Sequence, residues 1–142
     1  MIKNIILSII LSIPLHSFSQ IKFQHTYGLG VYTEGRSVKQ TLDGGYIIGG
    51  ITSDAGNGAT DCYLLKVDSL GNFQWHKTFG GSGIDRAYAV EQLPDSGYVL
   101  AGYTSSFGNG DYDSYLVRTN KIGDTLWTKT YGTSNWDFTY AL

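Results

Sequence analysis

The chain contains two consecutive copies of one unit, and this repetition constrains the fold more than any other feature. Residues 26–77 align without a gap with residues 78–129, at an offset of 52 from Thr26 to Thr78, and a third copy runs from Thr130 to Leu142. A fixed period of this size predicts an array of equivalent structural units. The recurring structural residues include Gly45, Tyr46, Gly50, Tyr63 and Trp75 in the first copy and Gly97, Tyr98, Gly102, Tyr115 and Trp127 in the second.

The segments between turn residues have the composition of short β-strands, rich in Tyr, Val and Ile. No stretch places apolar residues at helical spacing between a capping residue and a stop signal. The sequence therefore predicts an all-β fold with four strands in each copy. The predicted strands are residues 36–41, 46–52, 62–68 and 73–78 in the first copy, and residues 88–93, 98–104, 114–120 and 125–130 in the second.

Turn signals predict how these strands are connected, and hydrophobic patterns predict how deeply each strand is buried. Residues 43–45 (Asp-Gly-Gly) and 95–97 (Asp-Ser-Gly) predict hairpins between the first and second strands, because Gly accepts a positive φ without a Cβ clash. The second strand of each copy is apolar on both faces, which indicates burial from both sides. The fourth strand alternates apolar and polar residues and is predicted to be half-exposed at the outer edge.

A four-stranded antiparallel unit of about 50 residues has the size of one blade of a β-propeller. Gly49-Gly50 towards the end of the second strand, then Tyr63 and Trp75, resemble the kelch pattern, and residues 67–75 resemble the Asp…Gly…Trp turn of quinoprotein-type propellers. The whole repeat is similar to those of secreted bacterial propeller proteins exported by type IX secretion. Those repeats carry Asp-Gly-Gly-Tyr, found here at 43–46, Gly-Asn-Gly, found at 56–58, and Trp-x-Lys-Thr-Tyr-Gly-Gly, which reads Trp-His-Lys-Thr-Phe-Gly-Gly at 75–81.

The resemblance implies a β-propeller-like array, with two full blades and partial ones. Residues 21–28 align with residues 73–80, so residues 20–28 are predicted to be a leading outer strand. Residues 29–80 then form blade 1, residues 81–132 blade 2, and residues 133–142 the start of blade 3. A propeller typically has 4–8 blades. We therefore expect an N-terminal fragment of a larger fold, completed by further blades from the same longer chain or from other copies.

Residues 1–19 have the features of a secretory signal peptide, with Lys3 before an apolar run from Ile5 to Leu15 and small residues, Ser17 and Ser19, before Gln20. The apolar run is much shorter than the roughly 20 residues that a membrane span needs. The alternative is a buried N-terminal helix. The signal peptide predicts that residues 20–142 are secreted or held at the cell surface.

Few residues carry chemistry. The chain has 10 Lys and Arg against 12 Asp and Glu and no basic stripe, which argues against nucleic-acid binding. Cys62, the only cysteine, is replaced by Ser114 in the second copy and is interpreted as a small strand side chain, the alternative being a reactive or intermolecular thiol. Asp61 and Asp113 recur and are weak candidates for a Ca²⁺ site; the simpler interpretation is that they cap the loops before the third strands.

Two further sets of polar residues have structural interpretations. Asp85 and Asp137 are predicted to bond backbone amides where one blade crosses to the next, the alternative being a ligand role at the mouth of the ring. His25 and His76 are predicted to be surface residues of outer strands. No recurring His, Cys and carboxylate set indicates a zinc site or a nucleophile–base pair, so no catalytic or cofactor-binding residue is predicted.

The function predicted from the sequence is that of a non-catalytic binding or cell-surface scaffold for a glycan, a peptide or a surface protein. The alternative is a fragment of an exported propeller enzyme, quinoprotein-like or glycan-active, whose active site lies in other blades. A third possibility is that the chain has no independent function. The recurring Tyr and Trp residues are predicted to form the packing layer between blades, so that Trp127→Ala would cost about 3–5 kcal/mol if Trp127 is buried.

Overall fold

A computed structural model describes residues 23–28, 30 and 32–142; the predicted signal peptide lies outside the described residues. The described part of the chain is all-β and contains no helix, in agreement with the sequence prediction. All eight predicted strands are present. They are β1 (Thr33–Gln40), β2 (Tyr46–Thr52), β3 (Asp61–Val67), β4 (Phe73–Phe79), β5 (Asp85–Gln92), β6 (Tyr98–Thr104), β7 (Asp113–Thr119) and β8 (Thr125–Tyr131).

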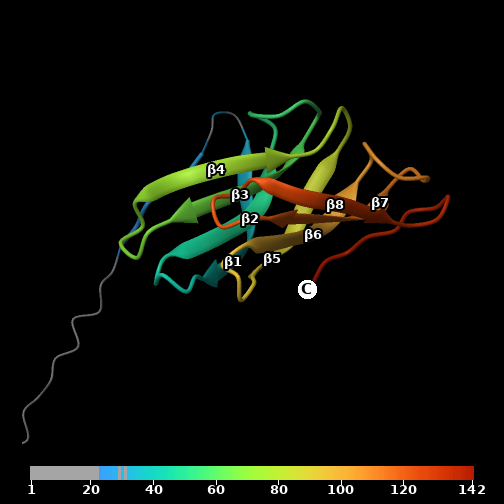
Figure 1. The fold of residues 1–142 in the computed structure, drawn as a ribbon. Coiled ribbons are helices and arrows are strands. Elements are labelled where there is room, and N and C mark those ends of the chain that lie inside the picture. The colour runs from blue at the N-terminus through green and yellow to red at the C-terminus, as the bar shows by residue number, and fades with distance from the viewer. Residues whose placement is uncertain (1–22, 29, 31) are drawn as a thin grey trace, which may run out of the picture.

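The strands form two four-stranded antiparallel sheets, β1-β2-β3-β4 and β5-β6-β7-β8, each a simple meander. We call them sheet A and sheet B. They lie face to face, and β5 of sheet B packs against β1, β2 and β3 of sheet A. Figure 1 shows this blade-like stacking, with the C-terminal end of the chain close to β5 and β6.

The first strand of each sheet is longer than the sequence predicted, because a β-bulge continues the pairing upstream. Arg36 is the extra residue between Gly35 and Ser37 in β1, and Tyr88 is its counterpart in β5. A Cβ atom on Gly50 would collide with the carbonyl of Glu34 beside the bulge, and a Cβ on Gly102 would collide with that of Arg86. Recurrence of glycine at these two positions therefore follows from the bulge.

The core between the sheets is made by side chains from both. Ile47, Cys62 and Leu64 of sheet A pack against Val90, Leu100 and Val117 of sheet B in one buried cluster. Trp75 packs at the edge of this cluster and contacts the ring of Tyr98 edge-on. Burial of apolar side chains of this size contributes about 1.5–3 kcal/mol each, so this core holds the two sheets together.

The outer faces of the pair are open, although they carry the same kinds of residue. Val90 is fully buried between the sheets, whereas Val38, its equivalent on the outer face of sheet A, is 59% exposed. Phe79 is 8% exposed, whereas Tyr131, its equivalent on the outer face of sheet B, is 54% exposed. The expectation of a buried Trp127 is wrong for the same reason: its side chain is 40% exposed, because no described sheet covers it.

The leading segment, residues 23–28, lies against the outer face of sheet A although it forms no strand. Phe23 contacts Tyr46 with ring centroids 5.9 Å apart and planes at 60°, and Trp75 contacts Tyr98 at 5.8 Å and 61°. Phe23 and His25 also lie over Gly71, as Trp75 and Lys77 lie over Gly123. Each pair is related by the repeat offset, so the leading segment lies where an outer strand would, but the strand predicted over residues 20–28 is not formed at residues 23–28.

Candidate functional site

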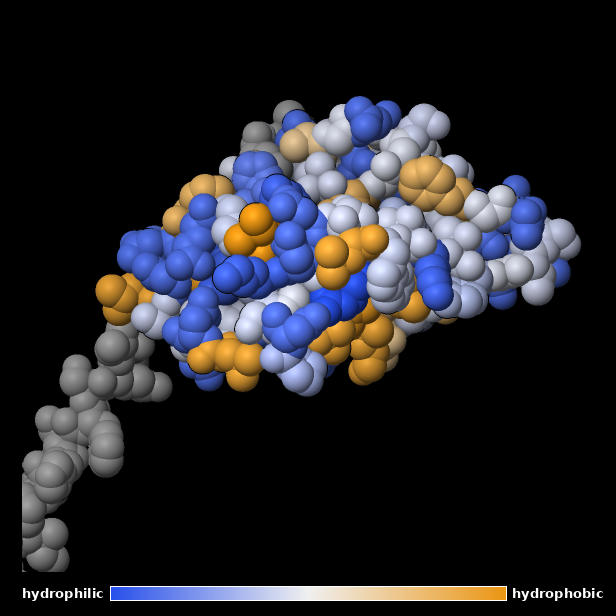
Figure 2. Space-filling model, in the orientation of Figure 1, coloured by the Kyte–Doolittle hydropathy of each residue, from blue (hydrophilic) through white to orange (hydrophobic). Residues whose placement is uncertain are grey.

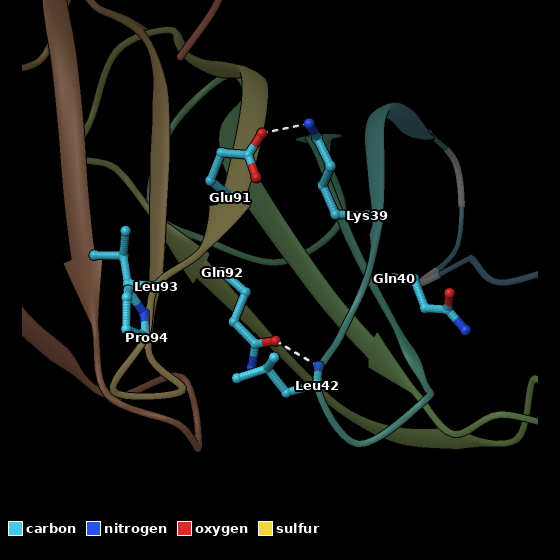
Figure 3. A pocket seen from close by; sticks show the side chains of 7 residues that line it. All are labelled: Lys39, Gln40, Leu42, Glu91, Gln92, Leu93 and Pro94. Atoms are coloured by element: carbon cyan, nitrogen blue, oxygen red, sulfur yellow. Dashed lines mark hydrogen bonds and ion pairs between the residues drawn. The ribbon is translucent and has the colours of Figure 1, made fainter.

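A hollow lies between the two sheets, where β1 and β5 end. It has a volume of about 490 Å³. Figure 3 shows its lining residues, which come from both sheets: Lys39, Gln40, Leu42, Glu91, Gln92, Leu93 and Pro94. Three of these from sheet A are the repeat equivalents of three from sheet B, so the hollow is formed where the same element of two successive units meets.

The hollow presents both charged and amide groups. Lys39 and Glu91 form an ion pair across it, and both side chains are more than a third exposed. The Gln92 side-chain oxygen accepts a hydrogen bond from the Leu42 backbone N–H at 2.8 Å, as Figure 3 shows. The Gln92 amide also donates to the Ser96 carbonyl at 3.2 Å, and Gln40 donates to the Gly44 carbonyl at 3.4 Å, but Figure 3 shows the Gln40 side chain pointing away from the other lining residues. Amides both donate and accept hydrogen bonds, and Leu42 and Leu93 add apolar surface, so the hollow suits a neutral polar ligand.

A buried cation lies behind each first hairpin turn. Lys66 is 3% exposed, and its Nζ lies 3.0 Å from the Asp43 carboxylate and 3.0 Å from the Val67 carbonyl. Arg118 makes the same contacts with Asp95 and Thr119 in sheet B. The Thr41 hydroxyl, the Gly45 N–H and Lys66 lower the pKa of Asp43 to about 2. The recurring aspartates at 43 and 95 therefore hold a buried cation as well as forming the turn.

These cations also explain two recurring glycines. A Cβ atom on Gly45 would overlap the Lys66 ammonium and the Val67 carbonyl. A Cβ on Gly97 would overlap the Arg118 guanidinium and the Thr119 carbonyl in the same way. Glycine at these positions therefore permits close approach of the cation to the backbone, a role that the turn signal alone did not reveal.

The recurring acids at the other end of the sheets bond the loops. The Asp85 carboxylate is fully buried and accepts hydrogen bonds from the Gly81 N–H at 2.8 Å and the Ser106 hydroxyl at 2.6 Å. The Asp137 carboxylate accepts one from the Thr133 N–H at 2.7 Å. The predicted bonding of backbone amides at both crossings is confirmed.

Asp61 and Asp113, the weak calcium candidates, are also engaged with loop amides. The Asp113 carboxylate accepts from the N–H groups of Asn109 and Gly110 at 3.1 and 3.0 Å. Asp61 is 3% exposed, and burial, together with the nearby Asp85 charge, raises its pKa. Within the described ranges, no three His, Cys, Asp or Glu side chains are grouped closely enough to hold a metal ion.

The remaining candidates lie in structural environments. Tyr63 is 2% exposed and packs with Leu65 and Val67 on the outer side of sheet A, while Tyr115 is 4% exposed and packs between the sheets. Cys62 is buried, and burial raises the pKa of its thiol well above the usual value. His25 is exposed and His76 is half-buried, beside the rings of Tyr63 and Phe73.

One set of side chains was not found from the sequence. The Arg36 guanidinium lies 4.8 Å from the centre of the Tyr88 ring, and Tyr88 contacts Tyr140 edge-on with centroids 4.9 Å apart. These three residues occupy the same position in successive units, and the first two are the bulge residues. The offset of 52 that relates them was the available signal, but their residue types differ and gave no reason to connect them.

The fold and these contacts define the protein as an all-β chain of repeated, blade-like sheets. No protein-family model matches the chain, and no curated protein matches it. Among the residues described, no helix has the length and apolarity needed to cross a membrane.

Proposed function

We propose that the chain is part of an exported β-propeller that acts as a non-catalytic binding scaffold. The two sheets then correspond to adjacent blades. The proposal rests on one observation: the hollow is formed by equivalent positions of two successive units, next to a packed interface between them. A repeated scaffold of this kind presents turns and strand ends along one edge while its core stays constant.

The chemistry of the hollow favours a glycan. Sugar hydroxyls need groups that both donate and accept, which the Gln92 amide supplies, and the apolar faces of sugar rings can lie on Leu42 and Leu93. The Lys39–Glu91 ion pair leaves the hollow without a large excess of either charge. Export is supported by the features of residues 1–19, and the resemblance of the repeat to secreted bacterial propeller proteins agrees with it.

A glycan array probed with the purified protein tests this function, with a peptide array run in parallel. We expect binding to a glycan, lost at least in part in Gln92→Ala and Leu93→Asp variants and kept in a Gln24→Ala control, whose exposed side chain lies outside the hollow. Binding only to peptides would change the ligand class. Absence of binding on both arrays, or binding unaffected by the two variants, would contradict a ligand site here. N-terminal sequencing of the secreted product tests export and should begin at Gln20.

A further inference from the structure

The open face of sheet A contains an apolar groove with a counterpart elsewhere in the molecule. The groove has a volume of about 380 Å³ and is lined by Phe23, Tyr27, Val38, Tyr46, Ile48 and Val67. Moving these residues along by the repeat offset gives Trp75, Phe79, Val90, Tyr98, Leu100 and Thr119. All but the last belong to the core between the sheets. The groove on sheet A is therefore equivalent to the surface of sheet B that packs against sheet A in the core, but no sheet packs on it among the described residues.

The residues that fill the internal interface identify what fits the groove. Ile47 and Leu64 are fully buried against sheet B. Their equivalents Val99 and Leu116 lie on the open face of sheet B, where they are only half-buried. Figure 2 shows apolar patches on the surface of the molecule. The chain therefore carries both a groove and the surface that matches it, at opposite ends of the sheet pair.

We propose that the open face of sheet B docks into the groove on sheet A of a second copy, so that copies associate head to tail. The contact continues the established internal interface by one further step. The proposal does not depend on the ligand of the scaffold.

Side-chain pairing across this contact follows from the internal one. The Trp75–Tyr98 contact becomes Trp127 against Tyr46 of the other copy, which keeps an aromatic pair. The Lys39–Glu91 ion pair becomes Glu91 against Lys39, which keeps opposite charges. One bond is lost, because the donor that corresponds to the Leu42 N–H falls at Pro94, which has none. We therefore expect a weaker interface than the internal one.

Two segments of the chain already occupy part of the docking faces. Phe23 and Tyr27 take the places that Trp127 and Tyr131 of an incoming copy need, and residues 133–142 cover part of sheet B through Phe138 and Tyr140. Residues 23–28 belong to no strand, whereas β8 arrives with its ladder of hydrogen bonds to β7. The leading segment thus competes with self-association, and loosening it should strengthen assembly.

The test is sedimentation equilibrium of the full-length expression product, with all variants in the same form, from about 10 μM to 1 mM. The native protein should show a molar mass that rises with concentration. Trp127→Asp, which alters one face, and Val38→Asp, which alters the other, should each be monomeric. Mixed in equal amounts, the two variants should form dimers and nothing larger, because each retains one intact face of a heterologous contact.

Controls keep the result interpretable. Both substituted side chains are exposed, so circular dichroism should be unchanged, and Tyr131→Asp and Val38→Lys replace either variant if it misfolds. Leu42→Asp, at a 75% exposed position outside both faces, should assemble normally. Phe23→Ser should lower the dissociation constant at least about threefold.

Three outcomes would overturn the inference. The native protein could stay monomeric over the whole range, as expected if the faces are reserved for further repeats of a longer chain. The two face variants could assemble like the native protein, or their mixture could fail to dimerise. An unchanged or raised dissociation constant for Phe23→Ser would refute competition by the leading segment.

Discussion

Trp75 and Tyr98 meet edge-on across the two sheets, with ring centroids 5.8 Å apart and planes at 61°. Trp127, the repeat equivalent of Trp75, has no aromatic ring partner among the described residues and is 40% exposed. One sequence position is therefore an interface residue in one unit and a surface residue in the next. This difference leads to a paired test of stability.

Trp75→Ala should lower the free energy of unfolding by about 2–3 kcal/mol, below the range for a fully buried Trp, because Trp75 is only partly buried. Trp127→Ala should cost less than about 1 kcal/mol, as for most surface substitutions. Urea unfolding at a concentration where the protein is monomeric measures both. Equal losses would show that the two tryptophans have similar environments in solution.

The Asp43–Lys66 pair should make stability depend on pH. The pKa of Asp43 is lowered to about 2, chiefly by the Thr41 hydroxyl bond. The carboxylate therefore contributes stability that is present above the unfolded pKa of about 3.9 and is lost as pH falls towards 2. Asp43→Asn should be less stable than the native protein at pH 6, with the difference shrinking between pH 4 and pH 2. Chemical denaturation across this range measures it, and a constant difference would refute the assignment.

The first hairpin turns give a matched pair of conformational substitutions. Gly44 has φ of 80°, and its equivalent Ser96 has φ of 68°. A Cβ atom added at Gly44 would have its nearest neighbour at 4.0 Å, so a substitution there changes stability through the backbone conformation and not through a steric clash. Ser96→Gly should raise the free energy of unfolding by about 0.5 kcal/mol and Gly44→Ser should lower it by about 1 kcal/mol. Thermal unfolding of the two variants checks that the two changes in stability have opposite signs. A loss of stability in both variants would contradict backbone strain at Ser96.

Asp85 should matter more than its equivalent Asp137. Asp85→Ala leaves the buried Thr104 hydroxyl and the Gly81 N–H without their acceptor, and should cost about 2–4 kcal/mol. Asp137 is only half-buried, so Asp137→Ala should cost about 1 kcal/mol or less. Urea unfolding compares them, and Asp85→Asn, which keeps an acceptor, should fall between native and Ala. A loss at Asp137 as large as that at Asp85 would contradict the burial argument.

The repeat and its turns were enough to predict the strands, because turn chemistry is local: Gly44 and Gly71 both adopt the positive φ that such turns use. The bulges at Arg36 and Tyr88 were not predictable, because a bulge depends on the register between two strands. Neither Arg nor Tyr is a residue type that indicates a bulge. The exposure of Trp127 was missed because burial is decided by whatever covers a sheet. The hollow was also not predicted, because it is lined by residues of two units whose relative placement the sequence pattern did not give.

The opposite faces of each sheet differ, and every sheet presents them in the same order along the chain. A deletion that joined residue 60 to residue 113 would remove one whole unit, yet both retained faces would still match. A duplication between the same points would add a sheet that fits its neighbours at once. Genes of this design can therefore lengthen or shorten by unequal recombination without any new contact having to evolve.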